Sequence, residues 1–478
     1  MTLGPERQVA DLADSYMAGH MSRRTFVKGM LALGLTTSAA GALLAACTTA
    51  PAVSPTTAAS AAATAAASAA SSNAPSASAA SVNTSLTGKV RFFLGPQNDK
   101  EEETQQVIIE AFHKVYPNIE VTTKLYDWDT ASALIQSAAE DGSFDVFLTD
   151  QGIYSKLNKR EDLFADISKY VDDPGWAAEK AHFLEWDRVL GLGTRVCGLP
   201  ADINFESAMW VNLDLATKAG YDAESIVKSR DAFRDACIKM TNAPAVYGLA
   251  YNTQPFTETY TNLIRNEKLD ILTPDLKSVA FETPEVVTAA NWWVDLLLKD
   301  KCVVPVGTYD YSTVIDAFAA QKVAIFASDT TVAATLKDRQ LPFEWAYLAW
   351  PPGQDRRAYN DLGLITMGAK TPNPDVTWAM MSFWSSGPSN AYWMDRSSLY
   401  PVRDDAVANG WGATVPKQVV DVLDPMLKIG TGPQLFPKWN DCEQVLQREF
   451  GRAMAGEITA GESVASAASE VNKIAFGP

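Results

Sequence analysis

The chain has 478 residues, with 40 lysines and arginines against 57 aspartates and glutamates, and a formal net charge of −17. Such an acidic chain is a poor candidate for nucleic-acid binding, which needs clustered basic side chains to meet the phosphates. Only three histidines are present, which is few for histidine-based catalysis or for a metal site built from histidines. We therefore expect no metal and no cofactor.

Residues 21–50 have the layout of a signal peptide. Arg23 and Arg24 come first and resemble a twin-arginine export signal. An uncharged run from Gly29 to Ala46 follows, and its Leu-Ala-Ala-Cys ending resembles a bacterial lipobox. That resemblance implies that residues 1–46 are removed and that Cys47 becomes the lipidated first residue. The alternative is a retained transmembrane helix, although the run is short for a span of about 20 residues.

Residues 48–85 carry no charge and no aromatic ring, and Ala, Ser, Thr and Pro dominate them. Such a segment cannot bury enough apolar surface to fold, so we predict a disordered tether over residues 47–85. A helix over Ala59–Ala70 is the alternative, because alanine favours helix. The protein is thus expected to work outside the cytoplasm, anchored to the membrane through lipid. Translation from Met1 and from Met21 both fit this reading.

The body, from about Leu86 to Pro478, is too long for one core, which rarely exceeds about 250 to 300 residues, so we expect two lobes. Four further cysteines lie in it: Cys197, Cys237, Cys302 and Cys442. An exported protein can pair them, but their pairing stays open, and no Cys-x-x-Cys spacing indicates a metal site.

The first body elements alternate between strands and helices. The segment "GKVRFFLGP" (88–96) reads as a buried strand and "EEETQQVIIEAFHKVYPN" as an amphipathic helix. The segment "IEVTTKL" alternates like a strand, a helix follows around Thr130 to Glu140, and "FDVFLTD" reads as a buried strand. This alternation predicts an α/β fold with a mostly parallel sheet and helices on both faces.

Later elements have clear boundaries. A strand is predicted over Ala208–Val211, and a helix with Thr283 as its cap begins "TPEVVTAANWWVDLLLKD". A helix starts at Asn373-Pro374 and stops at Gly387. In "NDCEQVLQREFGRAMAG", Asn440 and Glu443 form a near capping box.

Polar and aromatic residues in loops are the candidate ligand contacts. In parallel sheets ligands bind at the carboxyl ends of strands. Gln97, Asn98, Asp150 and Gln151 follow predicted strands and are therefore candidate contacts. Rings beside Pro or Gly turns offer flat faces on which sugar rings stack: Trp350, Tyr359, Tyr400 and Trp439. The alternatives are ordinary loop polar residues and rings that seal loops onto the core.

The order of the segments resembles the carbohydrate-type (family 1) extracellular solute-binding proteins of bacterial ABC importers over about residues 88–475. The resemblance is carried by "AFHKVYPNIEV", "FDVFLTD", "CGLPADINFESAMWVN", "VYGLAYN", "DAFAAQKVAIFASD" and "NDLGLITMGAKTPNPDVTWAMMSFWSS". It implies a periplasmic-binding-protein-like fold of two lobes, each a β-sheet flanked by helices, with the ligand in the cleft between them. Lobe one would be residues 88–200 plus 361–399, and lobe two residues 205–350 plus 404–478.

The family's pocket positions carry over to this sequence. They are Gln97, Asn98, Asp150, Gln151, Asp202, Asn204, Phe256, Glu258, Tyr260, Asn360, Asp361 and Trp439. Trp350 and Tyr400 complete the predicted site. One feature departs from the family: residues 328–331 read Ser-Asp-Thr-Thr where many members have an aromatic ring, which weakens the case for a long glucan ligand.

The resemblance implies a binding protein and not an enzyme. It would capture a mono- or oligosaccharide by hinge closure and deliver it to permease subunits of an ABC importer, as a monomer. The same fold could instead bind a polyamine, phosphate ester or peptide. Four arginines lie near the segments that would cross between the two lobes: Arg195, Arg356, Arg357 and Arg403. They leave an anionic ligand as an alternative. A secreted glycoside hydrolase with paired carboxylates and a sensor or adhesive lipoprotein are further alternatives.

Overall fold

The computed structural model describes residues 83–191, 195–205, 208–251, 256–432, 434, 436 and 438–477. All of them belong to one compact unit of the chain. The predictions for the signal peptide, for Arg23, Arg24 and Cys47, and for the tether before residue 83 lie outside the described residues.

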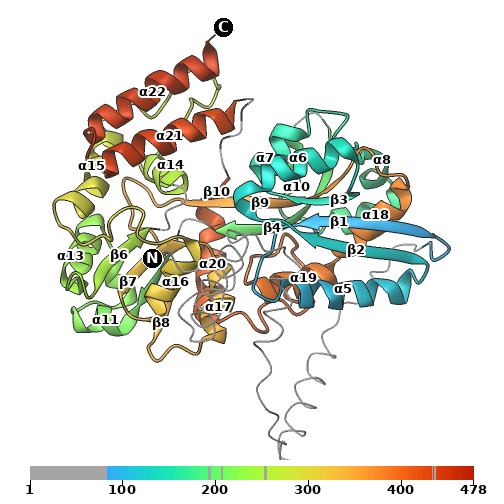
Figure 1. Cartoon of the computed structure of the whole chain (residues 1–478), viewed down its shortest axis with the longest axis horizontal. Coiled ribbons are helices and arrows are strands. Elements are labelled where there is room, and N and C mark those ends of the chain that lie inside the picture. The colour runs from blue at the N-terminus through green and yellow to red at the C-terminus, as the bar shows by residue number, and fades with distance from the viewer. Residues whose placement is uncertain are drawn as a thin grey trace, which may run out of the picture. The chain divides into compact units, whose positions relative to one another are not determined.

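The first sheet contains both parallel and antiparallel strands (Figure 1). Its strands run in the order β10-β9-β3-β1-β2, and β4 also pairs with β9. They are β1 (Gly88–Leu94), β2 (Ile119–Leu125), β3 (Val146–Thr149), β4 (Gly198–Phe205), β9 (Ala358–Met367) and β10 (Gly430–Thr431). Strand β1 is parallel to β2 and β3, whereas β9 is antiparallel to β3 and β4. Strand β10 pairs with β9 although its residues fall in the range predicted for lobe two.

Helices cover both faces of this sheet, with α5 and α19 on one side and α6 and α7 on the other (Figure 1). The α-helices are α5 (Glu101–Val115), α6 (Ala131–Asp141), α7 (Gln151–Leu157), α8 (Ser168–Val171), α9 (Ala177–Lys180), α10 (Trp186–Gly191), α18 (Pro374–Trp384) and α19 (Gly387–Ser397). The short 3-10 helices are η1 (Trp128–Thr130) and η2 (Pro174–Trp176). The alternation predicted from the sequence is therefore confirmed for this part of the chain.

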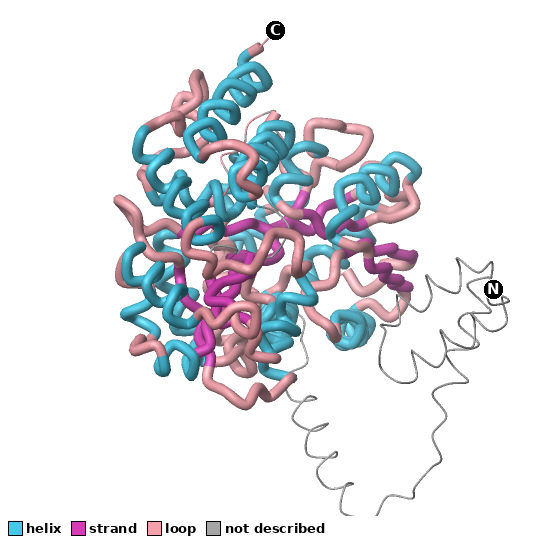
Figure 2. The backbone as a smooth tube through the Cα atoms, turned by 60° about the vertical axis from the view of Figure 1, so that its left-hand side comes forward, coloured by secondary structure: helices cyan, strands magenta, loops and turns pink. Residues whose placement is uncertain are grey.

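The second sheet has the order β6-β7-β5-β8. Its strands are β5 (Ala208–Asn212), β6 (Tyr247–Tyr251), β7 (Val323–Ser328) and β8 (Trp345–Ala349). The helices around it are α11 (Leu213–Lys218), α12 (Ala223–Ile226), α13 (Arg230–Met240), α14 (Phe256–Asn266), α15 (Pro284–Leu298), α16 (Tyr311–Ala319), α17 (Val332–Asp338), α20 (Lys417–Ile429), α21 (Trp439–Met454) and α22 (Ala460–Phe476). Figure 2 shows the strands of both sheets enclosed by helices. The predicted two-sheet α/β fold is confirmed.

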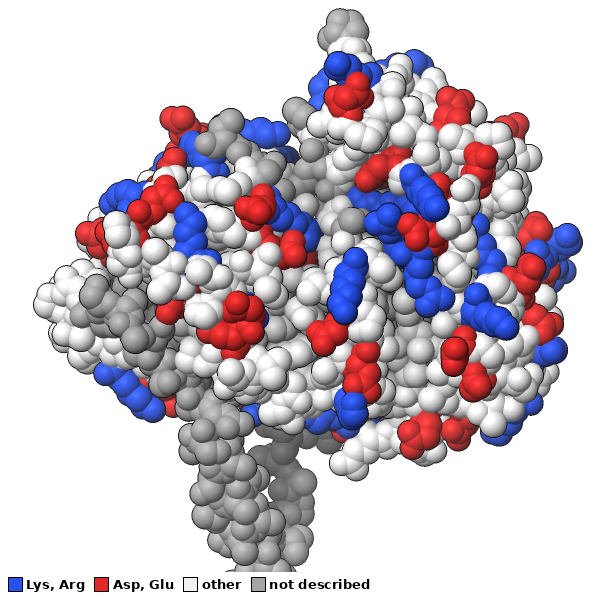
Figure 3. All heavy atoms as spheres, turned by 180° about the vertical axis from the view of Figure 1, so that it is seen from behind, with Lys and Arg blue, Asp and Glu red and all other residues white. Residues whose placement is uncertain are grey.

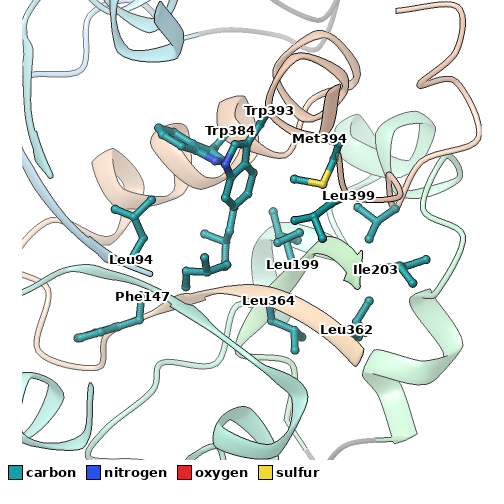
Figure 4. Close-up of a cluster of buried hydrophobic side chains, with 14 of the residues drawn as sticks. Leu94, Phe147, Leu199, Ile203, Leu362, Leu364, Trp384, Trp393, Met394 and Leu399 are labelled. Atoms are coloured by element: carbon teal, nitrogen blue, oxygen red, sulfur yellow. The ribbon is translucent and has the colours of Figure 1, made fainter. Parts of the chain in front are cut away.

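Strand β9 carries the core of the first sheet. Leu362 and Leu364 of β9 lie beside Leu199 and Ile203 of β4, below the indole rings of α18 and α19 (Figure 4). Those rings, Trp384 and Trp393, meet edge to face with centroids 5.7 Å apart. Edge-to-face ring pairs add to the stability gained from area burial alone. Apolar packing thus fixes the position of the β4–β9 ladder.

Two helix boundaries test the capping predictions. Thr283 caps α15 and accepts a hydrogen bond from the amide of Val286, as predicted. The predicted cap at Asn440 is wrong, because α21 already begins at Trp439 and Lys438 takes the cap position without a side-chain hydrogen bond. Glu443 is therefore free of any capping role. The helix from Pro374 ends at Trp384, and Gly387 begins the next helix instead of stopping this one.

Within the described residues, no helix is both long and apolar enough to span a membrane. The four cysteines there are free thiols, and all are buried. Cys237 and Cys302 lie in the same apolar core, and burial followed by a hydrogen bond between the two thiols raises the pKa of Cys237. The structure gives these cysteines a packing role.

Leu364→Ala should lower the free energy of unfolding by about 2–5 kcal/mol, because the side chain is fully buried and its removal leaves a cavity. Urea unfolding followed by circular dichroism measures the loss. Leu134→Ala is the control, since Leu134 on α6 is 41% exposed and its removal should change stability by about 0.5 kcal/mol or less. Equal effects from both substitutions would contradict the core assigned to β9.

Candidate ligand-binding site

The face of the β4–β9 ladder opposite the leucines is polar. Successive residues of a strand point to opposite faces, so Asp202 and Asn204 face away from the side of Ile203. Asp202 pairs with Gly363 and Asn204 with Asp361 in the antiparallel register. Directly paired residues share a face. Asp202, Asn204 and Asp361 therefore converge on one side of the sheet.

Gly363 makes room for the carboxylate of Asp202. A Cβ atom at position 363 would lie 2.0 Å from Oδ2 of Asp202, so any other residue there would force the carboxylate to move. Asp202 is only 4% exposed, and its Oδ2 has no hydrogen-bond partner among the described residues. An unpartnered carboxylate oxygen costs free energy in the interior, so it marks a place where a ligand donor would be favourable.

The end of β3 adds two more polar side chains. Asp150 caps α7, and its carboxylate accepts a hydrogen bond from the amide of Ile153 at 2.6 Å. Gln151 begins that helix, is 2% exposed, and leaves its Oε1 atom without a partner. The carboxylate of Asp150 raises the pKa of Asp202 and of Asp361, so the three groups are close in space.

Two further carboxylates complete the group. Glu101 at the start of α5 is 2% exposed and accepts hydrogen bonds from the amide of Gln97 and from the side chains of Asn98, Gln105 and Trp393. Glu443 reaches the site from α21, a helix that packs in the core of the second sheet and also contacts α7. We name Glu101, Asp150, Asp202, Asp361 and Glu443 the carboxylate cluster.

Burial dominates the titration of the carboxylate cluster. It raises the pKa of Glu101, Asp202 and Glu443 to about 7 each, and that of Asp361 well above its usual range. Repulsion from Asp150 adds to the increase at Asp202, Asp361 and Glu443. Burial and repulsion both disfavour the ionised form of a carboxyl.

One arginine lies against the cluster. Arg188 of α10 donates to both Oδ1 and the backbone oxygen of Asn360, each at 2.9 Å. Its charge favours the ionised form of Asp361 but is outweighed there by burial. Asn360 was predicted as a ligand contact, and the structure places its carboxamide against this guanidinium.

The remaining predicted residues divide into three groups. Gln97 and Asn98 hold Glu101, and Asn204 accepts a hydrogen bond from Thr330, at 3.4 Å, in the segment after β7. Tyr260, Trp350 and Trp439 are buried in the core around the second sheet, as rings that seal loops and helices onto it. Tyr400 is half-buried and donates to Asp424 at 2.8 Å. The side chains of Phe256 and Glu258 lie outside the described residues.

Sequence reasoning missed Glu101, Glu443 and Arg188. Glu101 was interpreted only as a favourable charge at a helix N-terminus, and Glu443 as part of a capping box. The period of 3.6 residues per turn could have flagged Glu443, because it lies one helical turn from Trp439, which was a candidate. Gly363 had no sequence signal beyond its position between two polar pairs.

The sequence matches the family described as bacterial extracellular solute-binding proteins over residues 107–418. The chain belongs to this family. The resemblance inferred from the sequence is therefore confirmed, and with it an extracytoplasmic place of action. The family match assigns solute binding and gives no support to the glycoside hydrolase alternative.

Solved structures of solute-binding proteins share the fold. The ABC substrate-binding protein of Listeria monocytogenes in complex with cycloalternan is 14% identical, with a TM-score of 0.72 over 81% of this chain and 99% of that chain. A solute-binding protein of Thermotoga lettingae bound to α-D-tagatose is 18% identical, with a TM-score of 0.72 over 81% and 100%. Maltose-bound MalE3 of Thermotoga maritima is 18% identical, with a TM-score of 0.69 over 80% and 99%. A comparison with curated protein sequences gave no match.

Asp202→Asn should flatten the pH dependence of stability. The folded pKa of Asp202 is about 7 against an ordinary 3.8, so the folded state holds a proton that the unfolded state has lost. The free energy of unfolding of the natural chain therefore falls as the pH rises from about 4 to about 7. The titratable groups that face this carboxyl are Glu101, Asp150, Asp361 and the phenol of Tyr126. None of them is a cation that would lower the pKa of Asp202.

The measurement is urea unfolding at pH 5 and at pH 8. Between these values the natural chain should lose about 2 kcal/mol more than Asp202→Asn, since one pKa unit corresponds to about 1.4 kcal/mol. Asp421→Asn is the control, because Asp421 is exposed and meets only Lys417 at the surface. Identical pH profiles for the natural chain and Asp202→Asn would contradict the buried state of Asp202.

Proposed function

We propose that this chain is the substrate-binding lipoprotein of an ABC importer and that it captures a carbohydrate. The observation that carries the proposal is that two buried oxygens, on Asp202 of β4 and on Gln151 at the start of α7, lack partners among the described residues in a member of a solute-binding family. Proteins with the same fold bind cycloalternan, α-D-tagatose and maltose. These ligands share several hydroxyl groups, which are hydrogen-bond donors.

The proposed contacts follow from this chemistry. Carboxylates accept hydrogen bonds from sugar hydroxyls, and amides both accept and donate. Asp150, Gln151, Asp202, Asn204 and Asp361 would hold the sugar on the side of the first sheet. Glu443 would contact it from α21, on the side of the second core. Contacts from both sides favour a closed arrangement of the two lobes, because a ligand shifts an equilibrium by its preference for one state.

The aromatic contribution is smaller than the sequence suggests. Among the predicted rings whose side chains the structure describes, Tyr260, Trp350, Tyr359 and Trp439 are buried, and Tyr400 keeps part of its surface accessible. Its ring meets Phe205 edge to face, with centroids 6.0 Å apart, next to the β4–β9 ladder. A site with many hydrogen-bond acceptors and few stacking faces fits a short sugar better than a long glucan.

The segment before the body would connect this site to transport. Arg23 and Arg24 would direct export, and lipid on Cys47 would hold the protein at the membrane. A flexible tether over residues 47–85 would keep the loaded protein near its permease at a raised effective concentration. Lobe one would comprise residues 88–200 plus 361–399, and lobe two residues 205–350 plus 404–478.

A panel of mono- and oligosaccharides tests the binding function. The full chain, purified from the cytoplasm, should melt at higher temperature with one class of sugar, because a ligand at 100 times its Kd stabilises the native state by about 2.7 kcal/mol. Asp361→Asn should abolish the shift, whereas the exposed control Asp421→Asn should keep it. Loss of the shift in both variants, or no shift with any sugar, would contradict the carbohydrate proposal.

Substitutions in the signal test the anchor. In the native host, Cys47→Ser should move the protein from the membrane fraction to a soluble extracytoplasmic fraction, since the thiol that receives the lipid is gone. Arg23→Lys with Arg24→Lys should leave the protein inside the cell. Fractionation followed by immunoblotting measures both, with Lys28→Arg as the matched control. A membrane-bound Cys47→Ser protein would indicate a retained helix instead.

A further inference from the structure

One uncharged side chain stands out on the described surface. On the face shown in Figure 3, lysine and arginine side chains are interspersed with aspartate and glutamate side chains. A strongly charged partner would need a patch of one sign, which this mixed pattern does not favour. Among the tryptophans whose side chains the structure describes, Trp128 is exposed, with 36% of its surface accessible, and the others are buried or half-buried.

Trp128 lies at the carboxyl ends of the parallel strands. Strands β1 and β2 end opposite each other, and the amide of Tyr126, just after β2, donates to the backbone oxygen of Leu94 at 3.1 Å. The phenol of Tyr126 donates to the backbone oxygen of Leu148 in β3 at 2.6 Å. Trp128 follows two residues later and begins η1. It therefore lies at the same edge of the sheet as Asp150, and ligands of parallel sheets bind at this edge.

The indole of Trp128 is held by three contacts. Its Nε1 donates to the backbone oxygen of Pro96 at 3.0 Å, and its ring meets the ring of Tyr126 at 87°, with centroids 5.1 Å apart. A Cβ atom at position 95 would lie 2.2, 2.4 and 2.6 Å from Cε2, Cζ2 and Nε1 of the indole. Because Cε2 lies between the other two atoms and is the nearest, the backbone of Gly95 packs against a face of the ring. The exposed surface of the indole is therefore on the side away from Gly95.

A ring that only sealed a loop onto the core would be covered. Tyr260, Trp350 and Trp439 are covered in this way. Trp128 is fixed by a hydrogen bond and by packing, yet it keeps an exposed surface. A flat face that is already immobilised costs little conformational entropy when a ligand stacks on it. The flat C–H face of a sugar ring matches such a surface.

We infer that Trp128 is the stacking platform for the second unit of a short oligosaccharide. The inference rests on the proposed carbohydrate function. Trp128 follows β2 and Asp150 follows β3, with β1 between these two strands. Neighbouring strands are about 4.8 Å apart, so the two strand ends are separated by about 10 Å. A sugar unit at Asp150 and Gln151 leaves Trp128 to the next unit, so the ligand is at least a disaccharide.

Isothermal titration calorimetry with the full chain tests the inference. The probes are glucose, galactose and mannose, each compared with α- and β-linked disaccharides of two identical units. The disaccharide of the recognised sugar should bind about tenfold more tightly than its monosaccharide, because only the disaccharide reaches the indole.

Three variants separate stacking from folding. Trp128→Ala should remove most of the preference for the disaccharide, whereas Trp128→Phe should keep part of it because a flat ring remains. Gly95→Ala keeps the indole but forces it to move, so it should act like Trp128→Ala. The affinity for the monosaccharide should change by no more than about twofold in each variant. Phe476→Ala is the control, because Phe476 on α22 is 39% exposed and lies outside the site.

The outcomes distinguish this inference from the proposed function. Equal losses for monosaccharide and disaccharide in Trp128→Ala would mean that the ring only seals the loop after β1, and would overturn the inference. Disaccharides that bind no more tightly than monosaccharides, or that bind Trp128→Ala as tightly as the natural chain, would overturn it too and leave the carbohydrate function standing. No binding of any sugar would overturn the carbohydrate function, and the inference with it.

Discussion

The structure depends on the β4–β9 ladder, whose two faces have opposite chemistry. Its buried leucines belong to one apolar cluster with the indole rings of α18 and α19, and that packing fixes the position of both strands. The other face places Asp202 against Gly363 and Asn204 against Asp361. The rigid leucine side keeps the carboxylates in place although they repel one another. The stability of the apolar packing thus supports an unfavourable charge arrangement beside it.

Such an arrangement is expected of a binding site. A protein that satisfied every buried oxygen internally would offer nothing to a solute. In the carboxylate cluster, Asp202 and Gln151 keep oxygens unpartnered, whereas Glu101 is held by four donors from its own neighbourhood. In the proposed site, Glu101 would contribute charge and shape, and the unpartnered oxygens would contribute direct contacts.

The fold could be predicted from the sequence wherever a hydrophobic pattern was strong. The continuous apolar run of "FDVFLTD" and the Thr-Pro start of α15 correspond to observed elements. The start of α21 could not be predicted to the residue, because the Asn-x-x-Glu spacing favours a capping box and the packing of Trp439 on Phe436 in the second core overrides it. Tertiary contacts decided that boundary.

The site could be predicted in part, because polar residues at strand ends and within crossing strands point to a cleft. Asp150 and Gln151 were predicted from the end of a strand, and Asp202, Asn204 and Asp361 from the resemblance to the family; the register of β4 and β9 places the last three on one side of the sheet. Their lack of counter-charges is a property of three-dimensional neighbours and has no signature along the chain. The loop rings failed as markers for a related reason: a ring beside a proline or glycine turn has the same local sequence whether it faces a cleft or a core.

The position of Glu443 connects charge to motion. Asp150 follows strand β3 of the first sheet, whereas Glu443 belongs to a helix that packs on the second core, and burial together with the charge of Asp150 raises the pKa of Glu443. In the proposed hinge closure, this repulsion would oppose the approach of the two lobes when the site is empty. A solute that donates hydrogen bonds to both carboxylates removes this opposition. The preference of the solute for the closed state would then come from the same carboxylates that select it, which couples recognition to closure without a separate switch.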